Sequence, residues 1–258
     1  MIGIFDSGVG GLTVYKEVRR LLPRAEVVYL ADRGNAPYGN RSLAEVETIA
    51  AACTTHLLNL GASTVVVACN TASAAALHPL RAQFPSVPFV GMEPAIKPAA
   101  AMTRSGVVGV LATAATFQGE LFSSLLDRYA TGLEVITQAC AGWAEMVEAG
   151  VVEGVLANQE VNRYLSPVLD MGADTLVLGC THYPFLHNTI AAIAGPQRPI
   201  IDPAAAVAAQ VARVATDPGD NGRTTLHSTG DPTTTRAIVS KLTDLDLGVE
   251  AVTLPLNA

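Results

Sequence analysis

The sequence predicts an α/β protein with two pseudo-symmetric lobes, each a three-layer arrangement around a mainly parallel sheet. Short runs rich in Val, Ile and Thr alternate with longer segments of helical periodicity almost throughout the 258 residues. This alternation is typical of strand-helix-strand units that build parallel sheets covered on both faces. Apolar residues form 50% of the chain, which is enough for an extensive core. One strand motif occurs twice, which indicates two copies of the same unit.

Ten segments are predicted strands because they are short, apolar or β-branched, and bounded by turn residues. A helix after the second strand is expected to begin with a capping box of Ser42 and Glu45. Asp202 followed by Pro203 marks another helix start. Cys53 falls at a helical core position, so we expect it to pack in the core. The predicted strands are residues 2–5, 27–30, 64–68, 89–91, 107–111, 134–137, 175–178, 200–201, 225–228 and 249–254.

The internal repeat relates residues 60–69, LGASTVVVAC, to residues 171–180, MGADTLVLGC. A weaker echo relates residues 3–7 to residues 109–113, in the same order along the chain. We therefore expect a first lobe from residues 1–92 plus 206–258 and a second from residues 93–205. Ligands of open parallel sheets bind at the carboxyl ends of the strands. The two cysteines that end the repeats are thus expected to face one cleft between the lobes.

Composition excludes several classes of function. The formal net charge of −7 comes without a Lys/Arg cluster, so no nucleic-acid partner is expected. No apolar run approaches the roughly 20 residues of a membrane helix, and no signal peptide is recognisable, so we expect a soluble cytoplasmic protein without a membrane partner. Cys53, Cys69, Cys140 and Cys180 are widely spaced, which argues against a disulfide framework or a structural zinc site.

The segment DSGVGG, residues 6–11, follows the first predicted strand. Its glycines permit a tight turn, and the next helix offers free backbone amides to an anion. A dinucleotide fingerprint requires a further glycine where Thr13 stands, so that interpretation fails. A simple tight turn before a helix remains the alternative.

Cys69-Asn70-Thr71 and Cys180-Thr181-His182 each place a thiol and small polar side chains between a strand and an expected helix. A helix N-terminus favours the thiolate. A single cysteine there is also explained by burial as a small apolar residue, and metal ligation by Cys69, Cys180 and His182 is another alternative. No metal is expected, because zinc sites add local ligand spacing. Packing does not require the same cysteine twice, so the repeat favours a paired chemical role.

Two further segments are candidates for ligand contact. The turn-rich loop 34–39 follows the second strand at the same sheet edge, and is either a binding loop or a surface turn. Thr113 and Thr116 follow the fifth strand, where their hydroxyls either contact a ligand or cap the next helix.

Taken together, the motifs DSGVGG, APYG, ACNTAS, LATAAT and LGCTHYP resemble the glutamate racemase family in identity, order and spacing across nearly the whole chain. The resemblance implies a cofactor-independent isomerase that interconverts L- and D-glutamate and supplies D-glutamate for peptidoglycan. It also implies a homodimer. In this family two cysteines act from opposite faces of the substrate's α-carbon, one removing a proton as thiolate and the other delivering one as thiol.

The resemblance also assigns residues. It implies that Cys69 deprotonates D-glutamate and Cys180 deprotonates L-glutamate, with Asp6 near the first thiol and His182 and Glu148 near the second as auxiliary acid/base groups. None of the motifs contains Arg or Lys, so neutral donors are expected to bind the two substrate carboxylates. The implied substrate contacts are Asp6, Ser7, Pro37, Tyr38, Gly39, Asn70, Thr71, Thr113, Thr116, Thr181 and His182.

The chain departs from the family pattern at a few positions. Gly119 and Phe122 stand where Ser and Tyr are usual, Ala141 replaces a proline after Cys140, and Lys97 is atypical. Two other functions stay open: a racemase for aspartate or another acidic amino acid, since one methylene of pocket length is invisible in a sequence, and a non-catalytic protein that binds small dicarboxylates.

Overall fold

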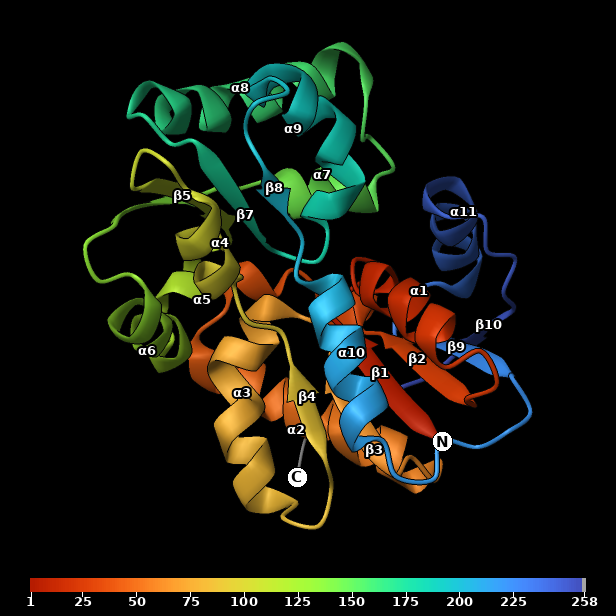
Figure 1. Ribbon diagram of the computed structural model, residues 1–258. Helices are drawn as coiled ribbons and strands as arrows, with labels where there is room; N and C mark the ends of the chain where they lie inside the picture. The colour runs from red at the N-terminus through yellow and green to blue at the C-terminus, as the bar shows by residue number, and fades with distance from the viewer. Residues whose placement is uncertain (257–258) are drawn as a thin grey trace.

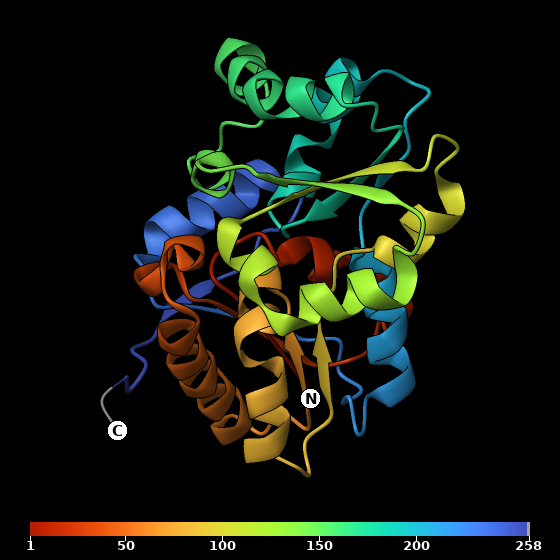
Figure 2. The same ribbon diagram turned by 90° about the vertical axis from the view of Figure 1, so that its left-hand side faces the viewer.

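A computed structural model describes residues 1–256 and contains two parallel sheets, each with helices on both faces (Figures 1 and 2). The six-stranded sheet has the order β10-β9-β2-β1-β3-β4, and the four-stranded sheet has the order β6-β5-β7-β8. Every strand pair is parallel, so the α/β prediction with two lobes is confirmed. No helix within residues 1–256 is long and apolar enough to cross a membrane.

The first lobe contains the six-stranded sheet and lies in the lower part of Figure 1. Helices α1, α10 and α11 contribute to the core on one face of this sheet, and α2 and α3 contribute to the core on the other. The strands are β1 (Ile2–Asp6), β2 (Val27–Ala31), β3 (Thr64–Val67), β4 (Phe89–Gly91), β9 (Thr224–Ser228) and β10 (Val249–Ala251). The helices are α1 (Leu12–Leu21), η1 (Arg33–Asn35), η2 (Tyr38–Asn40), α2 (Leu43–Asn59), α3 (Asn70–Gln83), α10 (Ala204–Val214) and α11 (Pro232–Leu242).

The second lobe contains the four-stranded sheet and lies in the upper part of Figure 1. Helices α7, α8 and α9 pack on one face, and α4 and α6 pack on the other. The strands are β5 (Val107–Ala112), β6 (Glu134–Ala139), β7 (Thr175–Gly179) and β8 (Ile200–Ile201). The helices are α4 (Ile96–Met102), α5 (Ala114–Gln118), α6 (Glu120–Tyr129), α7 (Trp143–Glu148), α8 (Gly154–Asp170), η3 (Tyr183–Leu186) and α9 (His187–Ala194).

The sequence repeat corresponds to a repeat in space. The order β2-β1-β3-β4 in the first lobe has the same topology as β6-β5-β7-β8 in the second. The registers also agree, because Ile4 pairs with Val66 in the first sheet and Val110 pairs with Val177 in the second. These pairs join the matched positions of both repeated segments. The two cysteines that end the repeats therefore occupy equivalent places in the two lobes.

The predicted elements agree closely with the structure. All ten predicted strands are present, and the largest difference is β10, which ends at Ala251 instead of residue 254. The capping box forms as expected, with the amide of Glu45 donating to Ser42 Oγ and the amide of Ser42 donating to Glu45 Oε2. Cys53 is fully buried in the core, so the packing prediction is confirmed.

The predicted start of α10 needs a small correction. The helix begins at Ala204, with Pro203 as its N-cap, one residue later than expected. Asp202 still supplies the predicted interaction, because its Oδ1 accepts a hydrogen bond from the amide of Ala204 at 2.9 Å. The carboxylate thus stabilises the first turn from just outside the helix.

Candidate active site

A cavity of about 560 Å³ lies at the carboxyl ends of both sheets. Cys69 follows β3 in the first lobe, Cys180 follows β7 in the second, and both line this cavity. The expectation that both repeated cysteines face one cleft is confirmed. Of the other predicted site residues, those that line the cavity are Ser7, Pro37, Tyr38, Gly39, Asn70, Thr71, Thr113, Glu148, Thr181 and His182.

Cys69 is the N-cap residue of α3 and is buried. Its sulfur accepts from the amide of Ala72 at 3.4 Å, and its thiol points to Ser7 Oγ at 3.9 Å. The helix amide lowers the pKa of Cys69, as expected for a helix start, but burial and the nearby Asp6 carboxylate raise it by more, to well above the usual range. In the free protein this direction favours the protonated thiol.

Asp6 does not line the cavity but lies behind its wall, fully buried. Its Oδ2 accepts from the amides of Gly8 at 3.3 Å and Gly11 at 2.9 Å. Its Oδ1 accepts from the hydroxyl of Thr181 in the second lobe at 3.3 Å. Burial raises the pKa of Asp6, although the positive charge on His182 and the two amides act in the opposite direction. Asp6 thus lies beside Cys69 in the layer behind the cavity wall, and its implied substrate contact stays a prediction.

Cys180 has a different environment from Cys69. Its sulfur lies 3.8 Å from Nδ1 of His182, and Nε2 of the same imidazole lies 2.8 Å from Oε1 of Glu148. Burial alone lowers the pKa of His182, but the hydrogen bonds to Cys180 and Glu148 outweigh it and hold that pKa well above its usual value. A protonated imidazole is a cation that favours a neighbouring thiolate.

The local structure after Cys180 also differs from the prediction. The chain enters the short 3₁₀ helix η3 at Tyr183, and not an α-helix as expected. The amides of a long helix are therefore absent at Cys180, and the polar side chain beside its sulfur is that of His182.

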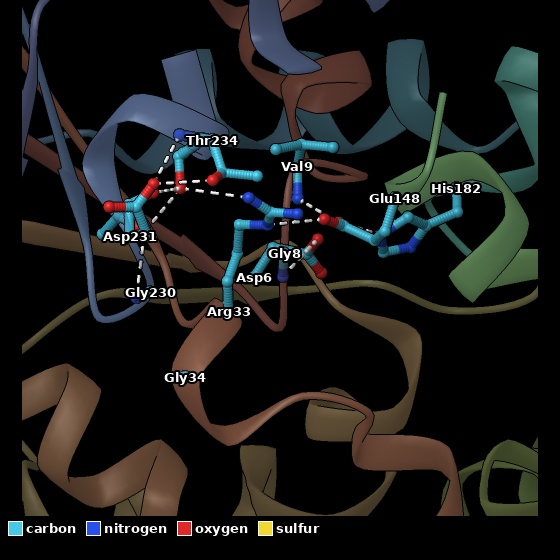
Figure 3. A network of polar contacts seen from close by, with 12 residues as sticks. Asp6, Gly8, Val9, Arg33, Gly34, Glu148, His182, Gly230, Asp231 and Thr234 are labelled. Atoms are coloured by element: carbon cyan, nitrogen blue, oxygen red, sulfur yellow. Dashed lines mark hydrogen bonds and ion pairs between the residues drawn. The ribbon is translucent and has the colours of Figure 1, made fainter. Parts of the chain in front are cut away.

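Glu148, at the end of α7, contacts three groups from both lobes (Figure 3). Its Oε1 accepts from the amide of Val9 at 2.6 Å in addition to His182, and its Oε2 accepts from Nε of Arg33 at 2.7 Å. Burial raises the pKa of Glu148, but the contacts with His182, Val9 and Arg33 together lower it below the usual value. The carboxylate is therefore charged at neutral pH.

Arg33 is a site residue that the motifs did not reveal. It lines the cavity directly after β2, outside the quoted motifs, none of which contains Arg or Lys. The expectation that neutral donors bind the substrate carboxylates stays a prediction. Arg33 follows the carboxyl end of β2, just as Ser7 follows β1 and Cys69 follows β3. Ligands bind at this edge of a parallel sheet, so the position of Arg33 after a predicted strand is the sequence signal for its place in the cavity. The other residues that line the cavity come from four segments of the chain, and they are Ala36, Asn40, Ala114, Ala139, Cys140, Ala141, Gly142, Ala144, Glu145, Gly230, Asp231 and Thr234.

The glycines of residues 6–11 have a role beyond a tight turn. A Cβ atom on Gly8 would lie 2.0 Å from Oε1 of Glu148, and one on Gly10 would lie 2.4 Å from Nδ1 of His182. Any side chain at these positions collides with the imidazole and carboxylate that face Cys180. The glycine loop is thus required by close packing between the lobes.

Asn70 is 3% exposed, lines the cavity, and has no hydrogen-bond partner at either its side-chain nitrogen or its side-chain oxygen. Buried polar groups are normally satisfied, so these two atoms are available to a ligand. Thr71 and Thr113 join the lobes through their hydroxyls at 2.8 Å. The hydroxyl of Thr116 lies 2.9 Å from that of Thr113 and outside the cavity lining, and its implied substrate contact stays a prediction.

Thr113 caps the next helix as expected, and its position also leaves a contact with a ligand open. It lines the cavity, and its hydroxyl accepts from the amide of Thr116 as the N-cap of α5. The loop 34–39 also lines the cavity through Pro37, Tyr38 and Gly39, so it is not merely a surface turn. The hydroxyl of Tyr38 donates to Asp32 at 2.5 Å, which fixes the loop to the end of β2.

Departures from the family pattern affect packing more than the cavity. A Cβ on Gly119 would lie 2.8 Å from the Cβ of Ala74, so glycine lets the junction of α5 and α6 pack closely on α3. Phe122 is buried against Phe117, and Nζ of Lys97 lies 5.8 Å from the ring centre of Tyr129. Within residues 1–256, no group of three or more His, Cys, Asp or Glu residues is arranged to hold a metal ion.

Comparisons with known proteins agree with this arrangement. The family model described as Asp/Glu/Hydantoin racemase matches residues 2–211. The chain is 52% identical to the glutamate racemase of Roseiflexus sp. over 90% of this chain and 88% of the relative, and 51% identical to that of Herpetosiphon aurantiacus over 83% and 84%.

Solved structures give the same result. Glutamate racemase isoform RacE1 from Bacillus anthracis superposes with a TM-score of 0.88 and 33% identity, covering 100% of this chain and 98% of that chain. Escherichia coli glutamate racemase, in complex with L-glutamate and the activator UDP-MurNAc-ala, gives a TM-score of 0.87 and 32% identity, covering 98% of both chains. The chain belongs to the Asp/Glu/hydantoin racemase family and, within it, to the glutamate racemases.

Proposed function

We propose that this protein racemises glutamate by moving a proton between two cysteines and the substrate's α-carbon. One observation carries the proposal: two thiols at matched strand ends of opposite lobes line a single cavity. Their environments differ, with Ser7 beside Cys69 and the His182–Glu148 pair beside Cys180. A base and an acid are thereby available at the same time on the two sides of the cavity.

The proposed reaction is a 1,1-proton transfer. With L-glutamate, the Cys180 thiolate takes the α-proton, and the Cys69 thiol donates its own proton to the opposite face, giving D-glutamate. Cys180 then carries the proton and Cys69 the negative charge, which is the starting state for the reverse reaction. One C–H bond and the Cys69 S–H bond break, and one C–H bond and the Cys180 S–H bond form. The assignment of Cys180 to the L-enantiomer comes from the family resemblance.

An α-proton beside a carboxylate is very weakly acidic, so the developing charge needs preorganised donors. The unpaired side-chain amide of Asn70 is one such donor, and its oxygen can accept from the substrate's ammonium group. Ser7, Thr71 and Thr181 add hydroxyls to the same wall. Their proposed role is to bind the two carboxylates. Asp6 and Thr116 are proposed to act indirectly, through Cys69 and Thr113.

Other features remain proposals. We propose that the lobe boundaries lie where the repeat suggests, at residues 1–92 plus 206–258 and residues 93–205. The strand membership supports this division, because the four-stranded sheet uses only strands between residues 107 and 201. Supply of D-glutamate for peptidoglycan is part of the same proposal. A homodimer, a cytoplasmic location, and the lack of nucleic-acid, membrane or cofactor partners stay predictions from the sequence.

The proposal is tested with the unmodified protein in heavy water. L- and D-glutamate, and separately L- and D-aspartate, are incubated with the enzyme and followed by polarimetry and by NMR of the α-proton. Either glutamate enantiomer is expected to reach the racemic mixture, with solvent deuterium at the α-carbon of the product. Faster turnover of aspartate would make the protein an aspartate racemase. Binding without exchange would make it a dicarboxylate-binding protein.

A further inference from the structure

Arg33 links the two lobes at the side of the cavity that holds Cys180. Its Nε donates to Oε2 of Glu148 at 2.7 Å, and its Nη1 donates to the hydroxyl of Thr235 at 3.2 Å. The Arg33 and Glu148 side chains are 16% and 17% exposed, so solvent screens their ion pair only partly. Figure 3 shows Arg33 between the start of α11 and the pair formed by Glu148 and His182.

The Glu148 carboxylate depends on this contact. Its Oε1 is already shared by the Val9 amide and His182, whereas Arg33 is the partner of Oε2. The carboxylate lies near a second buried carboxylate, that of Asp6, and the mutual repulsion raises the pKa of Asp6. Without Arg33, the carboxylate keeps His182 and the Val9 amide at Oε1, but Oε2 loses its partner in a partly buried place. The carboxylate is then more costly to keep charged and less firmly held in orientation.

The guanidinium is positioned for Glu148 and not for a substrate carboxylate. Asp231, the N-cap of α11, lies on its other side, and the positive charge of Arg33 is one of the effects that lower the pKa of Asp231. Two of its nitrogens are committed to Glu148 and Thr235. Among the described residues that line the cavity, Arg33 is the only Arg or Lys. Its positive charge is therefore placed to interact with the carboxylates of Glu148 and Asp231.

We propose that Arg33 is a positioning residue for the Cys180 half of the reaction: it holds Glu148 charged and oriented so that Glu148 fixes His182 against Cys180. This inference rests on the proposed racemase function. The chain of contacts runs from Arg33 to Glu148 to His182 to Cys180, with distances of 2.7, 2.8 and 3.8 Å. Cys69 has no part in this chain, since its polar contacts are with Ser7 and Ala72.

The test uses isotope effects, because rates alone do not separate the two halves. The two enantiomers have equal free energy, so any variant must lower kcat/KM by the same factor in both directions. A deuterium on L-glutamate slows only the transfer to Cys180, and a deuterium on D-glutamate slows only the transfer to Cys69. The two substrate isotope effects on kcat/KM therefore report separately on the two thiols.

For Arg33→Met we expect kcat/KM to fall roughly tenfold or more, the size of effect that follows the loss of a charged hydrogen bond to a buried carboxylate. The isotope effect with α-deuterated L-glutamate is expected to rise, and that with α-deuterated D-glutamate is expected to fall. Arg33→Lys keeps the positive charge and is expected to restore part of the rate and the original balance of isotope effects.

Arg236→Met is the matched control, because Arg236, on α11, forms an exposed ion pair with Asp246 and not with Glu148. It is expected to leave both isotope effects unchanged. If Arg33→Met does not fold, as judged by circular dichroism, Arg33→Gln carries the same comparison. Unchanged kcat/KM, or isotope effects that move together, would overturn the inference about Arg33. An unmodified enzyme that fails to racemise glutamate would instead refute the proposed function.

Discussion

The sulfur of Cys180 lies 3.8 Å from Nδ1 of His182. In the repeat, His182 occupies the position that Thr71 holds in the first lobe, two residues after the matched cysteine. Thr71 instead contacts Thr113, so the two copies diverge immediately after their thiols. The divergence gives two equivalent cysteines different polar neighbours, with Ser7 beside Cys69 and His182 beside Cys180. A two-base reaction requires one acid and one base at the same time, and unequal surroundings are suited to that requirement.

Replacement of His182 by Asn is expected to lower kcat by roughly 10²–10⁴-fold, the usual contribution of a positioned acid/base group. The imidazole that favours the Cys180 thiolate is lost, while the cavity keeps its shape. Steady-state kinetics in both directions measure the effect. His78→Asn, on the exposed surface of α3, is the control and is expected to be silent. A fully active His182→Asn enzyme would contradict the role given to the imidazole.

Gly8→Ala is expected to lower both activity and stability. The new Cβ would lie 2.0 Å from Oε1 of Glu148, so the carboxylate must move away from His182. Overpacking of this kind costs about 1–3 kcal/mol in the free energy of unfolding. Thermal or denaturant unfolding and kcat are measured together. Gly248→Ala is the matched control, because no atom lies within 4 Å of its added Cβ. Equal behaviour of the two variants would show that the close approach to Glu148 is unimportant.

Asn70→Ala separates binding from folding. The Asn70 amide has no partner within the protein, so its removal is expected to leave the free energy of unfolding nearly unchanged or slightly higher. KM for glutamate is expected to rise at least as much as kcat falls, because a substrate hydrogen bond is lost. Thr54→Val is the control, because it also removes a buried polar atom without a partner, but from helix α2 and outside the cavity lining. If KM stays the same in Asn70→Ala, the residue does not bind substrate.

Asp174 is expected to make stability pH-dependent. Burial is the largest single effect on its pKa and raises it, but hydrogen bonds from Thr103, Ser105, Arg104 and Thr175 together lower that pKa well below the usual value of 3.8. A group with a depressed folded pKa contributes stability above its unfolded pKa and loses it as the pH falls through the folded value.

Asp174→Asn is therefore expected to destabilise the protein by about 1–2 kcal/mol at pH 7. The difference from the unmodified protein is expected to shrink as the pH falls below about 4. Denaturant unfolding at several pH values measures it. The exposed Asp170 serves as the control through Asp170→Asn. A difference independent of pH would mean that the charge of Asp174 is not what stabilises this corner.

Much of the fold was predictable, because its main signals are local. Strand residues are short β-branched runs, and the repeat fixes which strands are equivalent, so residues 60–69 and 171–180 already predict two lobes with facing thiols. The capping box of Ser42 and Glu45 was equally local. Element boundaries differed mainly at β10, where the apolar run continues past the last ladder pair at Ala251.

The site was harder to predict where it depends on contacts between distant segments. Arg33 belongs to no motif, and its role appears only when β2 brings it against Glu148, 115 residues away. The sequence indicated the helix amide that lowers the pKa of Cys69, because that amide is a local feature, but not the burial that raises it, because burial depends on the whole lobe. Asp6 and Thr116 lie in the layer behind the cavity wall, a position that a sequence does not distinguish from the wall itself.

The most direct test of the central claim, that two thiols face one α-carbon from opposite sides, measures hydrogen exchange and inversion separately in Cys69→Ser and Cys180→Ser. Each variant is incubated with L- and with D-glutamate in heavy water, with exchange followed by NMR and inversion by polarimetry. Both variants are expected to lose racemisation, and the remaining slow exchange is expected on L-glutamate for Cys69→Ser and on D-glutamate for Cys180→Ser. Racemisation at the unmodified rate by either variant, or exchange of the same enantiomer by both, would contradict the account.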